Sequence, residues 1–276
     1  MAANCVSAVA PCRLSCFADS QVLWWHVRYP QAHWGYRSSV PPSPNLILPA
    51  VENALIARLT EPERSHLLAD AQEVPLVLAQ VLWQFGEPLA HVYFLTRGFV
   101  CLIAPGPAAL GLEMAMIGRE GMLGVQAVLG SDRTPFRAVV QGEGRAWRVP
   151  THLFQQHLVG HPATKRLLDR YAIFRLNQLA TLAQCLCHHE VRPRLARWLL
   201  MSQDRVGSDR FRVTQEALGF MLGVRRVSIT GAATSLQDRG VIAYHRGDLQ
   251  VLDRAALEQA ACNCYRSDIA RYTALL

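Results

Sequence analysis

The sequence predicts an α+β protein made of a roll of antiparallel strands, one long amphipathic helix, and a winged helix-turn-helix at the C-terminal end. Short apolar runs separated by glycine or proline recur between residues 74 and 149, which is typical of an antiparallel roll. Residues 162–190 carry apolar side chains at steps of three and four, which predicts a helix. Residues 214–252 read as two short helices around a glycine, followed by a hairpin.

Composition and pattern divide the chain of 276 residues into four segments. Residues 1–44 hold three cysteines and three tryptophans, show no sustained period and end in a proline-rich break. We therefore expect a flexible extension or a translation start assigned too far upstream. Residues 45–161 are expected to form the roll, 162–190 the long helix, and 191–276 the helix-turn-helix domain.

The predicted roll opens with a helix and continues with short strands. Thr60 to Glu63 form a capping box with proline in the first turn, so a helix is expected to reach about Asp70. Glycine-containing breaks, including Gly98 and residues 142–144, separate the strands. The predicted strands are 74–78, 81–84, 91–95, 99–103, 110–117, 136–141 and 145–149.

The segment from residue 214 to residue 252 carries the strongest functional signal. Thr214 is a plausible N-cap, and Gly223 supplies the positive φ angle that a short turn between helices needs. A second helix is expected from Arg226 to about residue 238, ending before Gly240. Its predicted apolar face is Val227, Ile229, Ala233 and Leu236.

A helix that opens with two arginines and small polar residues can enter a DNA major groove and reach base edges and phosphates. The hairpin that follows, with its turn at residues 245–248, resembles a basic wing. We therefore predict a surface that binds double-stranded DNA rather than a helix pair of some other fold. The predicted contacts are Thr214, Gln215, Arg225, Arg226, Ser228 and Thr230, with His245 and Arg246 of the wing touching phosphate.

The charge balance agrees with a polyanionic partner, because the formal net charge is +7. Nearly all the positive charge is arginine, and Lys165 is the one lysine of the chain. We expect no membrane association, since no apolar run reaches the roughly 18 to 20 residues of a bilayer span. No secretion signal or disulfide framework is recognisable, so a cytoplasmic location is expected. No pairing of nucleophile and base suggests an enzyme.

The long helix is expected to hold two copies of the chain together. Its apolar side chains form a seam of roughly 27 Å at 1.5 Å per residue, a length suited to pairing with a twin helix. Since helix-turn-helix proteins usually read two-fold symmetric operators, we predict a homodimer. Packing of the same face on the roll is the alternative. The predicted seam is Leu168, Ala172, Leu176, Leu179, Ala183 and Leu186.

The order of roll, long helix and winged helix-turn-helix resembles the Crp/Fnr family of the cyclic-AMP receptor protein and the fumarate-nitrate regulator. The resemblance covers about residues 45–265. Besides the helix-turn-helix, it rests on the sequences at residues 86–88, 118–121, 194–200 and 260–265. It implies a homodimeric transcription regulator with a cyclic-nucleotide-binding-like sensory roll, which is expected to work with RNA polymerase.

Within the helix-turn-helix, the resemblance places Thr214 and Gln215 at phosphate-contacting positions and Arg226 at the position of a guanine-reading arginine. The family's acidic residue and its later arginine are replaced by Val227 and Gly231. The operator is therefore expected to differ from that of the cyclic-AMP receptor protein.

The cassette that binds cyclic nucleotides in this family is degenerate here. Gly124, Gln126, Arg133 and Thr134 occupy the corresponding stretch. The carboxylate for the ribose is missing, and Pro135 removes a backbone donor. Cyclic-nucleotide control is therefore disfavoured, and the effector is left open.

Cysteine spacing also disfavours an iron–sulfur cluster. Cys5, Cys12, Cys16 and Cys101 give four thiols, but not at the family's spacing. Cys185 and His189 lie one turn apart, yet two ligands make an incomplete site, so Cys185 is expected to pack as a small apolar residue. No metal ligand and no cofactor is predicted, and the roles of Cys187, His188, Cys262 and Cys264 are left open.

The sequence therefore predicts a DNA-binding transcription regulator of the Crp/Fnr type that acts as a homodimer on an inverted repeat. Two alternatives stay open. One is a regulator that responds to redox state or to a metal, and the other is a cyclic-nucleotide-binding module that acts through protein contacts.

Overall fold

The computed structural model of the chain describes residues 52–106 and 111–276. The predicted extension, with Cys5, Cys12 and Cys16, lies outside the described residues. The roll is built on an antiparallel sheet in the order β1-β6-β3-β4, to which β2 and β5 are attached. Its strands are β1 (Gln72–Leu76), β2 (Val81–Trp83), β3 (His91–Ala104), β4 (Leu112–Ile117), β5 (Met122–Leu123) and β6 (Arg137–Pro150).

Two predicted strand breaks are wrong, because Gly98 and residues 142–144 lie inside long strands. β3 and β6 each run for 14 residues, and they pair from His91↔Pro150 to Ile103↔Arg137. The register shifts between residues 95 and 100. Gly98 has φ +76°, and a Cβ there would lie 2.3 Å from the carbonyl oxygen of Gly142. Glycine therefore permits a bulge with close backbone approach rather than a turn.

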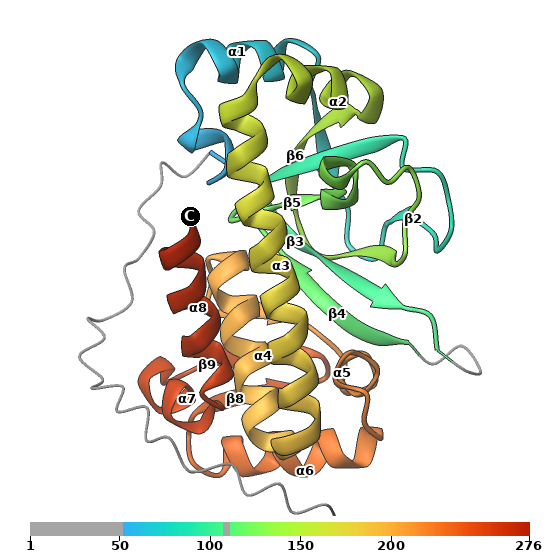
Figure 1. The fold of residues 1–276 in the computed structure, drawn as a ribbon. Helices are drawn as coiled ribbons and strands as arrows, with labels where there is room; N and C mark the ends of the chain where they lie inside the picture. The colour runs from blue at the N-terminus through green and yellow to red at the C-terminus, as the bar shows by residue number, and fades with distance from the viewer. Residues whose placement is uncertain (1–51, 107–110) are drawn as a thin grey trace, which may run out of the picture. The chain divides into compact units, whose positions relative to one another are not determined.

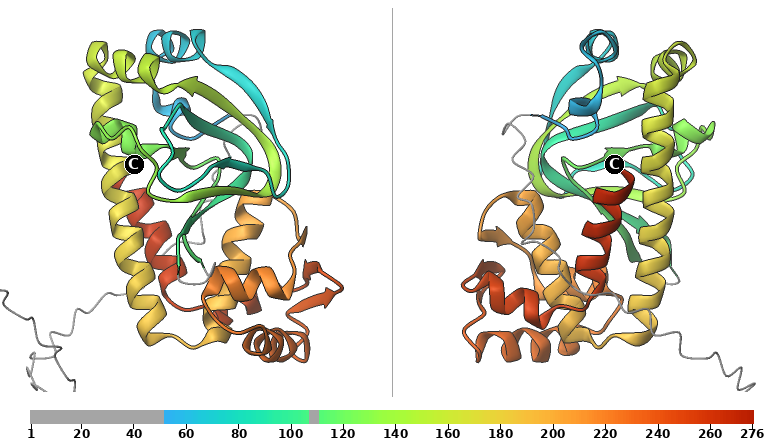
Figure 2. Two further views of the ribbon diagram at one scale, coloured as in Figure 1. Left: turned by 90° about the vertical axis from the view of Figure 1, so that its right-hand side faces the viewer. Right: turned by 60° about the vertical axis from the view of Figure 1, so that its left-hand side comes forward.

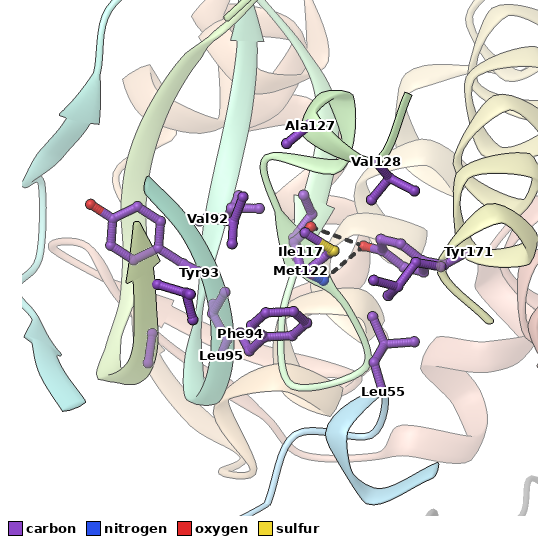
Figure 3. Packing of buried hydrophobic residues seen from close by; sticks show 14 of the residues in the cluster. Leu55, Val92, Tyr93, Phe94, Leu95, Ile117, Met122, Ala127, Val128 and Tyr171 are labelled. Atoms are coloured by element: carbon purple, nitrogen blue, oxygen red, sulfur yellow. Dashed lines mark hydrogen bonds between the residues drawn. The ribbon is translucent and has the colours of Figure 1, made fainter. Parts of the chain in front are cut away.

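One core fills the roll and extends to the long helix. Apolar side chains of β3, β5 and the 3-10 helix η3 (Val125–Leu129) converge on Tyr171 (Figure 3). Its hydroxyl donates to Met122 O at 3.3 Å and accepts from Met122 N at 3.2 Å. Burial raises the pKa of Tyr171 to about 12, so the phenol stays protonated and remains a donor.

The helices of the first half pack on this roll. The 3-10 helix η1 (Ile56–Arg58) and α1 (Glu61–Ala69) precede the sheet. The predicted capping box of Thr60 and Glu63 is confirmed. Helix α2 (Thr151–Gly160) leads into α3 (Pro162–His188), which runs from the roll to the C-terminal helices (Figure 1). Of the helices in the described part of the chain, none has the length and apolarity needed to cross a bilayer.

The C-terminal part forms a second core on the other face of the sheet. It contains α4 (Val191–Val206), α5 (Gln215–Leu222), α6 (Arg226–Gln237) and α7 (Arg254–Ala260), with the small sheet β7-β9-β8. The strands of that sheet are β7 (Arg210–Arg212), β8 (Ile242–His245) and β9 (Asp248–Val251). Side chains of β3 such as Phe99 and Cys101 belong to this core together with Trp198 of α4. The roll and α4 therefore share buried surface.

The last helix, α8 (Cys264–Leu275), lies beside α3 and returns to the roll (Figure 2). Tyr272 is buried in the roll's core, and its hydroxyl donates to Glu120 O at 2.7 Å. Asn53 Nδ2 donates to Gly121 O at 2.7 Å, so the same turn is also fixed by the first described residues. The turn between β4 and β5 is thus anchored from both ends of the described chain.

Candidate DNA-binding surface

The first helix of the helix-turn-helix begins and ends as the sequence predicts. The Thr214 hydroxyl oxygen accepts a hydrogen bond from Ala217 N at 3.1 Å, which satisfies a backbone donor that the first turn leaves free. Gly223 has φ +63° and ends α5. The capping and turn predictions are confirmed.

The second helix, α6, buries only part of its predicted apolar face. Ile229, Ala233 and Leu236 are buried against α4 and the small sheet. Val227 was predicted to join them, and this is wrong, because it is 71% exposed. It lies two positions before Ile229, and positions two apart on a helix point in different directions. Val227 is therefore an apolar group on the outer surface of α6.

The outer surface of α6 carries the predicted polar contacts. Arg225 is the N-cap residue and Arg226 the first helical residue, and both are exposed, as is Ser228. Among the described residues, neither guanidinium group takes part in a hydrogen bond or an ion pair. The first turn of α6 therefore presents two cations beside backbone N–H groups, an arrangement that favours phosphate.

Thr230 links the two helices of the motif. Its hydroxyl donates to Gln215 Oε1 at 2.7 Å and also lies 3.2 Å from Arg226 O. The contact holds the start of α5 against the middle of α6. Gln215 and Thr230 thus lie next to each other on the exposed surface.

The hairpin after α6 is a tight two-residue connection. His245 pairs with Asp248, while Arg246 and Gly247 have φ angles of +49° and +89°, as in a type I′ turn. The predicted turn at residues 245–248 is confirmed. Both His245 and Arg246 are exposed.

Backbone and side-chain hydrogen bonds tie this wing to the start of α5. Val213 N donates to Gly247 O at 2.8 Å, and the Tyr244 hydroxyl donates to Val213 O at 2.7 Å. The wing turn, the cap residue Thr214 and the start of α5 are therefore neighbours. Together with the Gln215–Thr230 contact, this brings the eight predicted DNA contacts onto one connected surface.

The wing has a third strand, β7, which was not predicted from the sequence. β7 pairs with β9 from Arg210↔Gln250 to Arg212↔Asp248, and Arg212 Nε lies 3.2 Å from Asp248 Oδ1. The alternation of charged and apolar residues from Arg210 to Val213 was the available signal. β7 places a further exposed arginine beside the wing.

The predicted dimer seam is only partly available to a partner. Leu168 and Ala172 are 2% and 5% exposed within the single chain. For these two residues the prediction is wrong, because α3 uses that face to cover the roll. Leu176 is 61% exposed, Leu179 and Leu186 are half-buried, and Ala183 is exposed.

The residues of the degenerate nucleotide cassette are already engaged within the roll. The Thr134 hydroxyl is buried and donates to Gln84 O at 2.7 Å, and Arg133 Nη1 donates to Gly86 O at 3.0 Å. Gly124 has φ +84° at the start of η3, with Val92 and Leu89 packed beside it. Gln126 Oε1 is buried without a partner among the described residues. A role for these residues in effector binding stays a prediction.

The structure brings together cysteines that the sequence left apart. Cys101 is fully buried in β3, and burial raises the pKa of its thiol well above the usual range. Cys185 and His189 at the end of α3 lie next to Cys262 and Cys264, which precede and begin α8. Cys187 and His188 are exposed and lie outside this group.

Comparisons with known proteins agree with this geometry. Residues 193–260 match the family model of the Crp-like helix-turn-helix domain. The global nitrogen regulator of Synechococcus elongatus is 24% identical over 184 residues, which are 63% of this chain and 82% of that protein. The global nitrogen regulator of a Nostoc strain is 23% identical over 176 residues, covering 60% of this chain and 78% of that protein.

Solved structures share the fold. The c-di-GMP-responsive global regulator CLP of Xanthomonas campestris superposes with a TM-score of 0.59 at 16% identity, covering 70% of this chain and 100% of that chain. A transcriptional regulator of the CRP/FNR family from Thermus thermophilus superposes with a TM-score of 0.51 at 21% identity, covering 69% of this chain and 98% of that chain.

A winged helix-turn-helix with an exposed, arginine-led second helix, fused to a β-roll, defines a DNA-binding transcription regulator. Residues 193–260 carry a Crp-like helix-turn-helix domain, and the resemblance to the Crp/Fnr family inferred from the sequence is confirmed.

Proposed function

We propose that two copies of this chain bind an inverted repeat, with α6 of each copy in the major groove of one half-site. The observation that carries the proposal is the free outer surface of α6, where Arg225, Arg226 and Ser228 are exposed around the helix start. Arginine forms paired hydrogen bonds to guanine, and small hydroxyls reach bases or phosphates. Val227 adds an apolar group that fits a thymine methyl.

The wing and the start of α5 supply backbone contacts in this proposal. Arg246 lies at the tip of the hairpin, and Thr214 and Gln215 at the N-terminal end of α5, where backbone N–H groups and the helix dipole favour phosphate. Phosphate contacts position the protein, while the side chains of α6 select the sequence.

The dimer is proposed to form through the exposed part of α3. Ile173 and Leu176 are 50% and 61% exposed, and Ala180 and Ala183 follow on the same face and are exposed. These positions are separated by three and four residues, the spacing of a helix-pairing seam. The seam is thus shifted from the predicted one toward Ile173 and toward the C-terminal half of α3.

We propose that the protein acts with RNA polymerase at the promoter, in a bacterial cytoplasm. No catalytic step is part of this function. We propose that DNA binding requires neither a cyclic nucleotide nor another cofactor. Run-off transcription from a promoter that carries the selected operator measures whether the protein raises or lowers initiation.

Selection of DNA from a random duplex pool, with protein purified without added ligand, tests the DNA-binding proposal. An enriched inverted repeat with half-sites about one helical turn apart is the expected result. Enrichment of a single, unrepeated half-site contradicts the dimer. Failure to enrich any sequence, both alone and with cyclic AMP, contradicts the proposal as a whole.

Two pairs of variants assign the contacts. Arg226→Ala is expected to weaken operator affinity by about 1–3 kcal/mol, or roughly 5- to 150-fold. Arg266→Ala, which removes an exposed arginine from α8, is the control and should bind as the parent does. Leu176→Glu is expected to yield monomers in sedimentation velocity. Val159→Glu changes an 86% exposed valine of α2 and should leave the dimer intact.

A further inference from the structure

Three cysteines and one histidine from distant parts of the sequence meet where the end of α3 contacts the connection between α7 and α8. Cys185 Sγ lies 3.6 Å from Cys262 Sγ, and Cys264 Sγ lies 3.6 Å from His189 Nδ1. All four potential ligand atoms lie within 4.8 Å of one another. Four soft or borderline donors thus lie close enough together to share one metal ion.

The backbone fixes both halves of the cluster. Cys185 and His189 are one helical turn apart, and His189 N donates to Cys185 O at 3.1 Å at the end of α3. Cys262 and Cys264 flank a single residue at the start of α8, where Cys262 N donates to Pro193 O at 3.3 Å. Each helix therefore contributes a preset pair of ligands.

The three sulfurs are shielded from water, since Cys185, Cys262 and Cys264 form a buried cluster of their own. All three cysteines are free. A disulfide requires sulfurs about 2.05 Å apart, so the spacing of Cys185 and Cys262 is that of separate thiols. His189 is half-buried and is the most exposed of the four residues.

The spacing fits a tetrahedral metal ion. With metal–sulfur bonds of about 2.3 Å and a metal–nitrogen bond of about 2.0 Å, sulfurs lie about 3.8 Å apart and sulfur and nitrogen about 3.5 Å apart. The distance of 3.6 Å between Cys185 Sγ and Cys262 Sγ and that of 3.6 Å between Cys264 Sγ and His189 Nδ1 are close to these values. Three thiolates and an imidazole are a ligand set that Zn²⁺ prefers, and with no position left open the site would be structural rather than catalytic.

Nearby arginines balance the charge of such a site. Three thiolates, a neutral imidazole and Zn²⁺ together carry one net negative charge. Arg194 and Arg197 of α4 both interact electrostatically with the sulfurs of Cys185 and Cys262. Arg197 Nη2 is already paired with Asp268 Oδ2 of α8 at 2.8 Å, so the charge of Arg194 is the one left to offset such a site. The surroundings therefore suit an anionic metal complex better than four neutral side chains.

We propose that Cys185, His189, Cys262 and Cys264 bind one Zn²⁺ ion that fastens the start of α8 to the end of α3. Binding replaces the thiol protons: three Cys–SH groups and His189 Nδ1 take up Zn²⁺ and release three protons to solvent, with no change of oxidation state. The ion would hold the DNA-binding domain's last helices against α3. Because α8 also contacts the roll, loss of the ion would loosen the connection between the roll and the DNA-binding domain.

Reconstitution of the full chain with Co²⁺ tests this directly, because tetrahedral thiolate-bound Co²⁺ absorbs strongly in the visible and near ultraviolet. The reduced, metal-free protein is expected to bind about one equivalent of Co²⁺ per chain. Zn²⁺ should then displace the bound Co²⁺ stoichiometrically. Zn²⁺ should also raise the midpoint of thermal unfolding. Absence of the tetrahedral spectrum at a stoichiometric ratio overturns the proposal.

Matched variants locate the site. Cys262→Ser and His189→Gln should each abolish or shift the Co²⁺ spectrum. Cys187→Ser removes an exposed thiol of the same helix and should leave it unchanged, as should the combined serine variant of Cys5, Cys12 and Cys16. Loss of the spectrum in either control assigns the metal elsewhere and refutes the site. A Cys185–Cys262 disulfide in anaerobically purified protein, detected by mass spectrometry, would also refute it.

Circular dichroism of Cys262→Ser and His189→Gln separates the loss of a metal ligand from the loss of folding. Retained helicity with a lost Co²⁺ spectrum in His189→Gln supports the proposal. An unchanged Co²⁺ spectrum in folded His189→Gln contradicts the assignment of the fourth ligand.

Discussion

The ion pair between Glu120 and Arg205 joins the roll to the last turn of α4. Glu120 Oε1 accepts hydrogen bonds from Arg205 Nη2 at 2.6 Å and from Arg205 Nε at 3.0 Å. It also accepts from Gly118 N at 3.1 Å, which holds the β4–β5 turn. The two side chains are only 20% and 11% exposed. The pair is thus largely shielded from water.

Glu120→Gln keeps the shape of the side chain but leaves the Arg205 charge without its carboxylate. Breaking a fully buried pair costs about 3–5 kcal/mol. Because part of the Glu120 side chain reaches solvent, water offsets some of that cost, and we expect a loss of about 2 kcal/mol in the free energy of unfolding. In the double variant with Arg205→Met, no unpaired charge remains. The two losses should therefore not add, with a coupling energy of about 1 kcal/mol or more.

Urea unfolding followed by tryptophan fluorescence measures both quantities, since Trp83, Trp147 and Trp198 lie in the roll and in α4. The control is Glu143→Gln, which changes an exposed glutamate and should shift the midpoint little. A loss below about 0.5 kcal/mol for Glu120→Gln would refute the reasoning, as would additive effects in the double variant.

Three further outcomes follow from local geometry. Gly98→Ala should lower the free energy of unfolding by more than about 2 kcal/mol, because its Cβ meets a backbone oxygen at 2.3 Å. Gly86→Ala is also at positive φ but in open space, and it should cost only about 1–2 kcal/mol. Equal losses of the two variants in thermal unfolding would contradict this. Thr214→Ala should lower the free energy of unfolding by about 1 kcal/mol in urea, because the cap of α5 is lost, whereas Thr214→Ser keeps the cap. Equal stability of the two variants would contradict the capping role. Burial and the neighbouring His161 and His66 lower the pKa of His157 to about 4. The unfolded chain therefore binds the extra proton first, so stability present above pH 6.5 should fall as the pH drops toward 4, by on the order of 1 kcal/mol or more. His157→Gln should flatten that part of the profile of unfolding temperature against pH, and parallel profiles would count against it.

The sequence predicted the helix-turn-helix well because its signals are local. The cap at Thr214, the positive φ at Gly223 and the two-residue turn before Asp248 each depend on residues within four positions of one another. Local preferences of this kind are readable from one sequence without knowledge of the tertiary fold. The capping box at Thr60 was predictable for the same reason.

Features that depend on tertiary packing were missed or wrongly predicted. Gly98 reads as a turn in the sequence, and only the crossing of β3 and β6 shows that it is a bulge. Leu168 and Leu176 belong to the same run of apolar positions three and four residues apart, but the roll covers Leu168 and leaves Leu176 exposed. Periodicity identifies an apolar face without identifying what covers it.

The group around Cys185 shows the same limit at longer range. Cys262 lies 77 positions from Cys185, and Cys264 lies 75 positions from His189. Within the sequence, the neighbouring residues Cys185 and His189, or Cys262 and Cys264, supply only two ligands each and do not define a metal site alone. Only the packing of α8 against α3 completes a set of four ligand atoms.

The return of α8 to the roll fixes the order in which the protein can be completed during synthesis. Tyr272 is part of the roll's core, and Leu275 and Leu276 pack against it, although every strand of the roll precedes residue 151. Arg58 Nε also donates to Leu276 O at 2.8 Å. A roll that has emerged from the ribosome thus keeps an apolar patch uncovered while more than a hundred further residues are translated. The core of the roll is therefore complete only after α8 has been synthesised.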